Sequence, residues 1–243
     1  MNLKIKNKTN FIHNFLNPIS RINDLCSLTL ENNSIYSLNR TSDSNFMLYA
    51  STDDICYEGE KRILSFADIK KFSKAFECVS QDTDIDLKLN ENNIEYSSHL
   101  NKFKFHLIND NIVRGPNYNI DKLNSLEYDT EFTLNYNSYL NLIKSSTFIS
   151  SEKIYLNTVD GKMYGELTDK TKSNIDSYTL SISESYNGSA LDKPLCFDFN
   201  LFRSIAMPKN SESIIRLSNK GIIAFVIEQD KYKLKYISTA HVS

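Results

Sequence analysis

The sequence of 243 residues is poor in glycine, with six, and in proline, with four. The glycines are dispersed, and neither G-x-G-x-x-G nor G-x-x-x-x-G-K-[ST] occurs. Nucleotide-binding folds use glycine clusters because only glycine lets the backbone amides come close to a phosphate. The sequence therefore gives no sign of a dinucleotide-binding or nucleoside-triphosphate-binding enzyme.

Cysteine and histidine, the usual zinc ligands and nucleophile partners, are also scarce. The cysteines are Cys26, Cys56, Cys78 and Cys196, and the histidines are His13, His99, His106 and His241. No C-x-x-C pair occurs, and no histidine stands beside a cysteine to complete a zinc site. We interpret the cysteines as reduced, mostly buried thiols, and the histidines as scattered over separate elements without a nucleophile nearby.

One acidic stretch, DTDID (82–86), has the spacing that opens a calcium-binding loop. Such a loop needs glycine at its sixth position and glutamate at its twelfth, where this sequence has Leu87 and Asn93. We therefore expect no metal, no cofactor and no enzyme activity.

Long apolar runs are missing as well. No run approaches the roughly 18 residues that a membrane-spanning helix needs, and the N-terminal stretch MNLKIKNKTN lacks the apolar core of a signal peptide. With 40% hydrophobic and 24% charged residues, the composition is that of an ordinary globular protein. We expect a cytoplasmic protein with no membrane contact.

The second half of the chain shows a pattern of strand, helix and three strands, twice over. In the first copy EFTLNY (131–136) alternates, NSYLNLIKSS (137–146) has helical spacing, and the strands KIYLNTV, KMYGELT and IDSYTLSIS follow, with a hairpin turn at Asp160-Gly161. In the second copy the strand PLCFDFN leads into a short helix, LFRSIAM, closed by Pro208. The stretch 214–237 then supplies three more strands.

The first half repeats the same order of elements. KRILSF (61–66) leads into the helix ADIKKFSKAFECV (67–79) and the strands DIDLKLN, NIEYSS and KFKFHLI. Before it come NLKIK, the helix TNFIHNFLN ending at Pro18, and the strands LCSLTLE, SIYSLNR and NFMLYAS. Four β-α-β-β-β units with a period of roughly 55 to 65 residues indicate repetition of one supersecondary unit.

These repeats predict an α+β protein of two similar domains, each built from two units. The stretch 111–129 has no clear periodicity and holds Gly115 and Pro116, so we expect it to connect a domain at 1–110 to a domain at 130–243. Turns this short cannot hold the crossover that parallel strands need. We therefore expect antiparallel sheets on the outside and helices packed on one face.

The charge is unevenly distributed although the net charge is only −2. The predicted helical segments (4–22, 66–77, 136–150 and 200–210) have a net charge of +8, which leaves −10 for the rest of the chain. Their basic residues are Lys4, Lys6, Lys8, Arg21, Lys70, Lys71, Lys74, Lys144, Arg203 and Lys209.

The helix at 67–79 shows how this charge is presented. At 100° per residue Ile69, Phe72 and Phe76 share one stripe, and the lysines of the helix lie near the opposite side. A single basic helix is usually only a solvated surface. Four such helices in equivalent repeats favour contact with DNA phosphates without sequence readout.

The repeat order and the lysine-bearing helices resemble those of the DNA sliding clamps, the polymerase processivity factors. IIRLSNKGIIAFVIEQDKYKLKYI (214–237), with its LKY at 234–236, is similar to the closing strands of that family, and YLNLIKSSTFISSEKIYLNTVDGKMYGEL (139–167) to the start of its second domain. In length and in its two-domain layout the chain resembles the clamps of T-even-like phages and the eukaryotic proliferating cell nuclear antigen. The first 60 residues fit the family pattern least well.

The resemblance implies the DNA clamp fold and a closed ring around duplex DNA, formed by three chains head to tail, in the cytoplasm of a bacterial host if a phage encodes the chain. It implies pairing between the edge strands KFKFHLI (102–108) and IDSYTLSIS (175–183), with the helices lining the hole. The implied DNA-contacting residues are Lys8, Lys70, Lys71, Lys74, Lys144, Arg203 and Lys209.

The resemblance also implies partners: a DNA polymerase, and an ATP-driven loader that opens the ring. Partner peptides of the family dock into a groove beneath the connector and beside the C-terminal strand. The matching positions here are Met47, Leu48, Ile112, Val113, Tyr236 and Ile237. Each of them is also compatible with an ordinary half-buried position in a strand or loop.

Two other functions remain open from the sequence. One is a β-rich viral structural or scaffold protein in which the repeat only builds sheet and the basic helices face solvent. The other is a hydrolase whose site the sequence pattern does not reveal.

Overall fold

A computed structural model of the chain describes residues 1–79, 84–113, 120–149 and 151–241. By its contacts the chain forms two compact units. The first consists of Met1–Asp121 with Glu228–Leu234, and the second of Lys122–Ile227 with Lys235–Ser243. The chain first passes from one unit to the other at Asp121 and Lys122, inside the stretch where the sequence predicts a connector.

The first unit contains two of the predicted repeats. The strands of the first repeat are β1 (Asn2–Ile5), β2 (Cys26–Glu31), β3 (Ser34–Arg40) and β4 (Phe46–Thr52), and its helical segment is α1 (Lys8–Phe11), η1 (Ile12–Leu16) and α2 (Asn17–Ile22). The second repeat comprises β6 (Arg62–Phe66), α3 (Ile69–Glu77), β7 (Ile85–Asn90), β8 (Asn93–Ser97) and β9 (Lys102–His106). A short strand, β5 (Ile55–Cys56), joins the two repeats.

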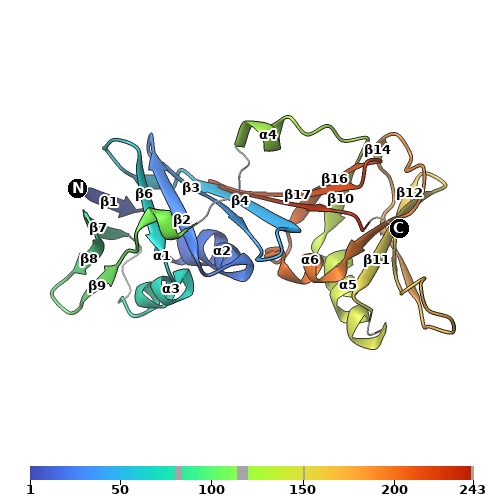
Figure 1. Ribbon diagram of the computed structural model, residues 1–243, viewed down its shortest axis with the longest axis horizontal. Helices are drawn as coiled ribbons and strands as arrows, with labels where there is room; N and C mark the ends of the chain where they lie inside the picture. Colours follow the sequence, from blue (N-terminus) through green and yellow to red (C-terminus); the bar gives the residue numbers. More distant parts are fainter. Residues whose placement is uncertain (80–83, 114–119, 150, 242–243) are drawn as a thin grey trace. The chain divides into compact units, whose positions relative to one another are not determined.

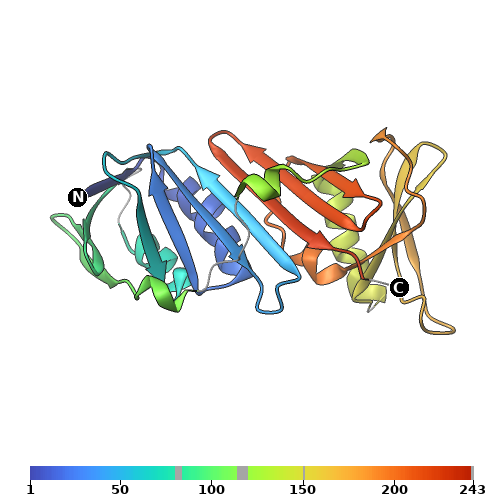
Figure 2. The same ribbon diagram turned by 45° about the horizontal axis from the view of Figure 1, so that its top comes forward.

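The strands of the first unit pair antiparallel in two groups. The order is β5-β1-β7-β8-β9 in one group and β4-β3-β2-β6 in the other. The helices α1, α2 and α3 lie together on the same side of these strands (Figures 1 and 2). An aromatic cluster joins the layers, because Phe72 of α3 contacts Phe66 of β6 at 4.8 Å and Phe105 of β9 at 5.0 Å between ring centroids.

The second unit contains the other two repeats. The third is β10 (Thr130–Asn135), α5 (Tyr136–Ile149), β11 (Lys153–Val159), β12 (Lys162–Leu167) and β13 (Tyr178–Ser183). The fourth is β15 (Leu195–Asp198), α6 (Phe199–Ser204), β16 (Glu212–Ser218), β17 (Ile222–Gln229) and β18 (Tyr232–Thr239). The predicted α+β class and the fourfold repeat are therefore confirmed.

Antiparallel pairing also builds the sheets of the second unit. The orders are β13-β12-β11-β15 and β14-β10-β16-β17-β18, where β14 is the short strand Asn187–Gly188. The predicted turn between β11 and β12 is present, with Asp160 at φ 50° and Gly161 at φ 76°. Positive φ at both central residues is what a two-residue hairpin turn of type I′ requires.

Helix starts follow from capping side chains. The side chain of Asn7 accepts a hydrogen bond from the backbone of Asn10 at the start of α1, and that of Asp68 accepts one from Lys71 at the start of α3. Asp198 caps α6 in the same way through Asn200. Each cap satisfies a backbone N–H that the helix itself leaves without a partner.

Two helix ends differ from the prediction. The first helical segment does not stop at Pro18 but continues to Ile22, because a π-helical turn (η1) precedes the proline and rearranges the backbone hydrogen bonds around it. The helix α6 ends at Ser204, short of Pro208. The hydroxyl of Tyr139 lies 3.0 Å from the carbonyl oxygens of both Phe202 and Ile205, so its one proton is shared between these groups at the helix end.

The stretch between the two units has local structure that the sequence does not indicate. The 3₁₀ turn η2 (Asp110–Ile112) and the five-residue helix α4 (Ile120–Asn124) lie in it. Gly115 and Pro116, on which the prediction of a connector rested, fall outside the described residues.

Candidate functional site

The helix α3 carries the clearest cluster of positive charge in the first unit. Ile69, Phe72 and Phe76 are buried against the strands, as the sequence predicts. The lysines on the other side of the helix, Lys70, Lys71 and Lys74, are exposed. Among the described residues none of these three ammonium groups has an ion-pair or hydrogen-bond partner, so each can meet an external anion.

Lys8, on the neighbouring helix α1, has a different environment. Its ammonium group donates a hydrogen bond to the backbone carbonyl of Val79 at 2.6 Å, just beyond the end of α3. The rings of Phe11 and Phe76 are in edge contact at 6.1 Å between centroids, so α1 and α3 lie side by side. Lys8 therefore ties the two helices together, and this interaction links residues 71 positions apart.

The helices of the second unit also lie side by side and also present cations. Lys144 on α5 and Arg203 on α6 are exposed, and the Tyr139 hydroxyl bonds that join α5 to the end of α6 hold the two helices together. Arg203 lies over the ring of Phe199 at 5.0 Å from its centroid and donates to the side chain of Asn200 at 2.8 Å. Lys209 is exposed, but it lies in the loop after α6 and not on the helix.

Each unit therefore has a layer of helices whose apolar side packs on strands and whose other side carries exposed lysine or arginine. Within the first unit the exposed group is the α3 triad, and within the second it is Lys144, Arg203 and Lys209. Mobile, exposed cations of this kind attract phosphates through screened electrostatics and read no base edges.

The strand β9 is a free edge of its group, since only β8 pairs with it. The backbone N–H of Leu107 donates to the carbonyl of Asn92, and the ladder alternates from there. The N–H and C=O groups of Lys102, Lys104 and His106 accordingly point away from β8. On the helix-facing side, Phe103 and Phe105 are only half-buried.

The strand β13 is the corresponding free edge in the second unit, where it pairs only with β12. Its residues Tyr178 and Leu180 are half-buried, and Ile182 is buried. Phe148, on the helix α5 that packs against β13, is 70% exposed. Both edges thus combine unpaired backbone groups with incompletely covered apolar side chains, which is typical of strands that pair with another chain.

Comparison with solved structures gives full-length matches. The structure described as the C-terminal region of FEN-1 bound to A. fulgidus PCNA matches with a TM-score of 0.81 and 12% identity, over 100% of this chain and 98% of that chain. The PCNA of Thermococcus kodakaraensis matches with 0.78 and 12% over 99% of both chains, and that of Entamoeba histolytica with 0.77 and 13% over 99% and 98%. The chain has the sliding-clamp fold.

The similarity lies in the structure rather than in the sequence. No family model matches the chain, and no curated protein matches it in sequence. The predicted resemblance to sliding clamps is therefore confirmed by the fold, over the whole length, including the first 60 residues where the sequence pattern fits least well. In this fold β9 and β13 are each an end strand of a sheet.

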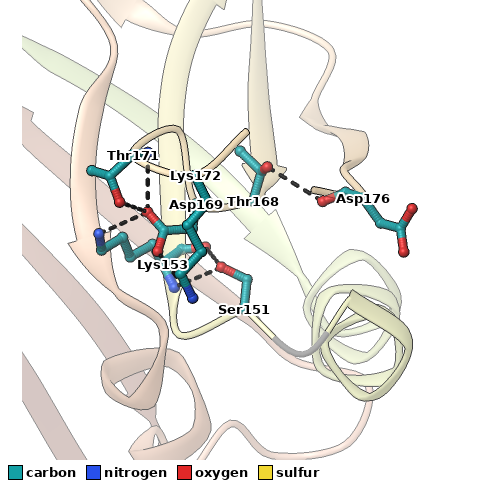
Figure 3. Close-up of polar contacts among 7 residues, drawn as sticks. All are labelled: Ser151, Lys153, Thr168, Asp169, Thr171, Lys172 and Asp176. Carbon is teal, nitrogen blue, oxygen red and sulfur yellow. Dashed lines mark hydrogen bonds and ion pairs between the residues drawn. The ribbon is translucent and has the colours of Figure 1, made fainter. Parts of the chain in front are cut away.

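A polar cluster ties the loop before β13 to the strand β11 (Figure 3). The ammonium group of Lys153 donates to the carboxylate of Asp169 at 2.8 Å, and the hydroxyl of Thr171 donates to the same oxygen at 2.6 Å. These donors, Lys153 first, hold the pKa of Asp169 well below its usual value of 3.8. The cluster fixes the path of the chain that leads into the edge strand.

Replacing Asp169 by asparagine should loosen the loop between β12 and β13. In the Asp169→Asn variant we expect amide hydrogen exchange between residues 170 and 177 to become about twofold to fivefold faster, as for the loss of the partly exposed ion pairs with Lys153 and Lys172. The control is Asp176→Asn, because the described contact of Asp176 is made by its backbone carbonyl with the hydroxyl of Thr168. Equal exchange rates in the wild type and in Asp169→Asn would show that the cluster does not hold the loop.

The contribution of Asp169 to folding stability should decrease at low pH. Because the folded-state pKa of Asp169 lies below the usual 3.8, the unfolded chain takes up the proton first as the pH falls. The stabilising contribution of Asp169 is thus complete above pH 3.8 and declines below it.

The six residues matched to the family's partner groove do not share one environment. Leu48, Tyr236 and Ile237 are buried in the strands, with at most 4% exposure, so their side chains are not presented to a partner. Strand alternation places Leu48 and Tyr236 on the helix side, whereas Ile237, the next residue of β18, lies on the opposite side and is buried there. Met47 is half-buried, and Ile112 is 58% exposed.

The structure instead places Ile112 and Val113 beside apolar residues that the sequence analysis did not single out. Together with Leu25, Leu38 and other residues they line a hollow of about 260 Å³ in the first unit. Met47 is not part of this hollow. The sequence gives little indication of this hollow, because Leu25 and Leu38 have the pattern of ordinary strand residues. Only the structure shows that Ile112 and Val113 lie beside them.

Two expectations, about metal binding and about membrane contact, concern the described part of the chain. There, no group of three or more histidine, cysteine or acidic side chains is arranged to hold a metal ion. Asp82 and Thr83, which open the calcium-like stretch, fall outside the described residues. No helix in the described ranges is long and apolar enough to span a membrane.

Proposed function

We propose that the chain is the subunit of a sliding clamp, a ring that encircles duplex DNA and tethers the replicative polymerase and other proteins to it. The observation that carries this proposal is the layer of basic helices in each unit of a chain that has the clamp fold over its full length. The matched structures of similar fold argue against a β-rich scaffold in which these helices only face solvent. The proposed function is that of a binding protein and involves no catalysis or cofactor.

The proposed contacts between the basic side chains and DNA are individually weak. Lys70, Lys71 and Lys74 of one unit, and Lys144, Arg203 and Lys209 of the other, would meet phosphates through long side chains that hold no fixed register. Such contacts let the ring move along the duplex, because screened ion pairs are exchanged at little cost. Retention then comes from the closed ring and not from affinity.

The proposed ring contains three copies of the chain, each with domains at 1–110 and 130–243 joined by 111–129. The edge strand β9 of one copy would pair with β13 of the next, which removes both free edges and covers Phe148. Head-to-tail contacts of this kind form a closed ring if the rotation from one copy to the next is a whole fraction of a full turn, here one third.

The proposed partners follow from the family resemblance. One matched clamp is described as bound to the C-terminal region of FEN-1, so its fold accommodates a partner segment. In this chain we assign such docking to the hollow beside Ile112 and Val113. A DNA polymerase is the expected tethered enzyme, and an ATP-driven loader would open the ring.

Native mass and DNA topology test this function together. We expect a particle of three times the 28.0 kDa of one chain, which remains on a nicked circular plasmid during gel filtration and is released when the plasmid is cut once. A protein bound only by charge would stay on linear and circular DNA alike. A monomeric particle, or equal retention before and after cutting, would contradict the proposal.

A further inference from the structure

The dipeptide Asn187-Gly188 forms an exposed sheet edge in the second unit. It is the one place in the sequence where glycine follows an asparagine. The two residues make up the short strand β14, which is an end strand of its sheet and, in the described part of the chain, pairs only with β10. Both residues are exposed, so water and hydroxide can reach them.

The backbone N–H of Gly188 is not used by the sheet. The N–H of Ser189 donates to the carbonyl of Asp129 at 2.8 Å, one position beyond the register partners Thr130 and Gly188. In an antiparallel ladder this bond makes Thr130 and Gly188 a non-hydrogen-bonded pair. The N–H of Gly188 therefore points away from β10, to a side of β14 where the described residues place no strand.

The side chain of Asn187 is equally unrestrained. It is exposed, and among the described residues no hydrogen bond holds its amide group. The amide carbon Cγ of an asparagine can be attacked by the backbone nitrogen of the next residue, which closes a succinimide ring. Glycine has no Cβ to hinder that approach. At this edge the nitrogen of Gly188 and the Cγ of Asn187 can thus meet without obstruction.

The fold itself requires the glycine of this pair. Gly188 has φ 90°, and a Cβ at that position would lie 2.1 Å from the carbonyl oxygen of Asp129. Any other residue would need the backbone to move, because both the conformation and the close approach permit only glycine. A bulkier neighbour that would shield Asn187 is therefore incompatible with this turn.

We propose that Asn187 is a site of spontaneous deamidation, which converts it to aspartate and isoaspartate through a cyclic imide with Gly188. Hydroxide takes the proton of the Gly188 nitrogen, the nitrogen bonds to Cγ of Asn187, and the bond from Cγ to Nδ2 breaks. Nδ2 takes a proton from water and leaves as ammonia. Water then opens the imide: cleavage between the nitrogen and Cγ gives aspartate, and cleavage between the nitrogen and the backbone carbonyl carbon gives isoaspartate.

The two products change β14 in different ways. Aspartate keeps the backbone and places a carboxylate directly across from Glu131, the register partner of residue 187, where like charges repel. Isoaspartate carries the chain through Cγ and lengthens the backbone by one methylene group. A strand of two residues cannot keep its register with such an insertion, so isoaspartate releases β14 from β10.

Peptide mass mapping of the full chain, incubated in mildly alkaline buffer and sampled over time, tests the reaction. We expect deamidation at Asn187 to be at least about tenfold faster than at Asn210, which is also exposed but precedes Ser211, a residue with a Cβ and an N–H that donates to Pro208. Electron-transfer fragmentation should show isoaspartate at position 187. Direct hydrolysis of the side chain would give aspartate alone.

Three comparisons assign the effect to this edge of the fold. The rate in the folded chain should lie within about tenfold of the rate in urea, because a short exposed strand opens at little cost. Asn187→Gln should lose the product, since the longer side chain must close a larger ring. Asn187→Asp has the charge of one product on an unchanged backbone. The ladder directs the amide of Glu131 toward β14, so its hydrogen exchange should be at least about fivefold faster in the isoaspartate form than in Asn187→Asp.

Several results would overturn the inference. They are an absence of isoaspartate at position 187, equal rates at Asn187 and Asn210, and a rate in the folded chain more than about tenfold below that in urea. Equal exchange of the Glu131 amide in the isoaspartate form and in Asn187→Asp would overturn the release of β14. The assay contains no DNA and needs no ring, so its outcome is independent of the proposed clamp function.

Discussion

Reversing the charge of the α3 lysines should abolish productive contact with DNA. In the variant Lys70→Glu, Lys71→Glu, Lys74→Glu we expect affinity for a short duplex at low salt to fall by more than about tenfold, because each lysine that meets a phosphate releases condensed counterions. The slope of log affinity against log salt should also become smaller. Fluorescence anisotropy with a labelled duplex measures both quantities.

Stability should not change with this charge reversal. The three side chains are exposed and make no described ion pair, so the melting temperature should remain within a few degrees of the wild type. The matched control reverses three exposed lysines that lie outside the helices: Lys88, Lys193 and Lys220. Since it alters the net charge equally, similar losses of affinity in both variants would mean that α3 is not the DNA-contacting surface.

Blocking the outer edge of β9 should dissociate the ring. The N–H of Lys104 points away from β8, so a proline there removes a donor that the isolated subunit does not use. In Lys104→Pro we expect native mass to fall from three chains to one at micromolar concentration, and retention on circular DNA to be lost. The subunit should still unfold cooperatively, because the pairing of β8 with β9 keeps its own hydrogen bonds.

The control for this prediction separates the backbone from the side chain. Lys104 also forms an ion pair with Glu95 at 3.5 Å, and Lys104→Ala removes that pair while it keeps the N–H. Because exposed ion pairs contribute little, the alanine variant should remain a trimer. If the proline variant also stays trimeric, β9 is not the pairing edge, whereas dissociation of both variants would point to the charge of Lys104.

The two predictions probe different parts of the same function. The α3 variant should form a normal ring that holds DNA poorly, and the β9 variant should lose the ring with its cations unchanged. If the chain were a scaffold protein with solvent-facing helices, neither the α3 variant nor the β9 variant would reduce retention on DNA. The pair of variants therefore distinguishes affinity from topology.

Local pattern was sufficient for most of the elements. The alternation in KIYLNTV and KMYGELT places β11 and β12, and the stripe of Ile69, Phe72 and Phe76 gives both the existence and the buried face of α3. These features depend on neighbouring residues, because side chains repeat every two positions in a strand and about every 3.6 in a helix. The helix ends were less predictable, since the π-helical turn before Pro18 and the Tyr139 hydroxyl at the end of α6 depend on packing.

The candidate site also has features that local pattern predicts and features that depend on packing. The exposure of Lys70, Lys71 and Lys74 follows from the helical pattern alone. The bond from Lys8 to the carbonyl of Val79 does not, because it joins segments that only the fold brings together. Leu48, Tyr236 and Ile237 were matched to a docking groove by resemblance, and their burial is seen only in the fold.

By itself the sequence determined four repeats, their strands and helices, and the side of each helix that carries positive charge, because these depend on periodicity within one element. The family resemblance already implied the edge strands at 102–108 and 175–183. Only the tertiary structure decided which side chains meet across elements. The bond from Lys153 to Asp169 is the clearest case, since its two residues come from β11 and from the loop between β12 and β13. Pairing between distant strands sets such contacts, and no local pattern encodes that pairing.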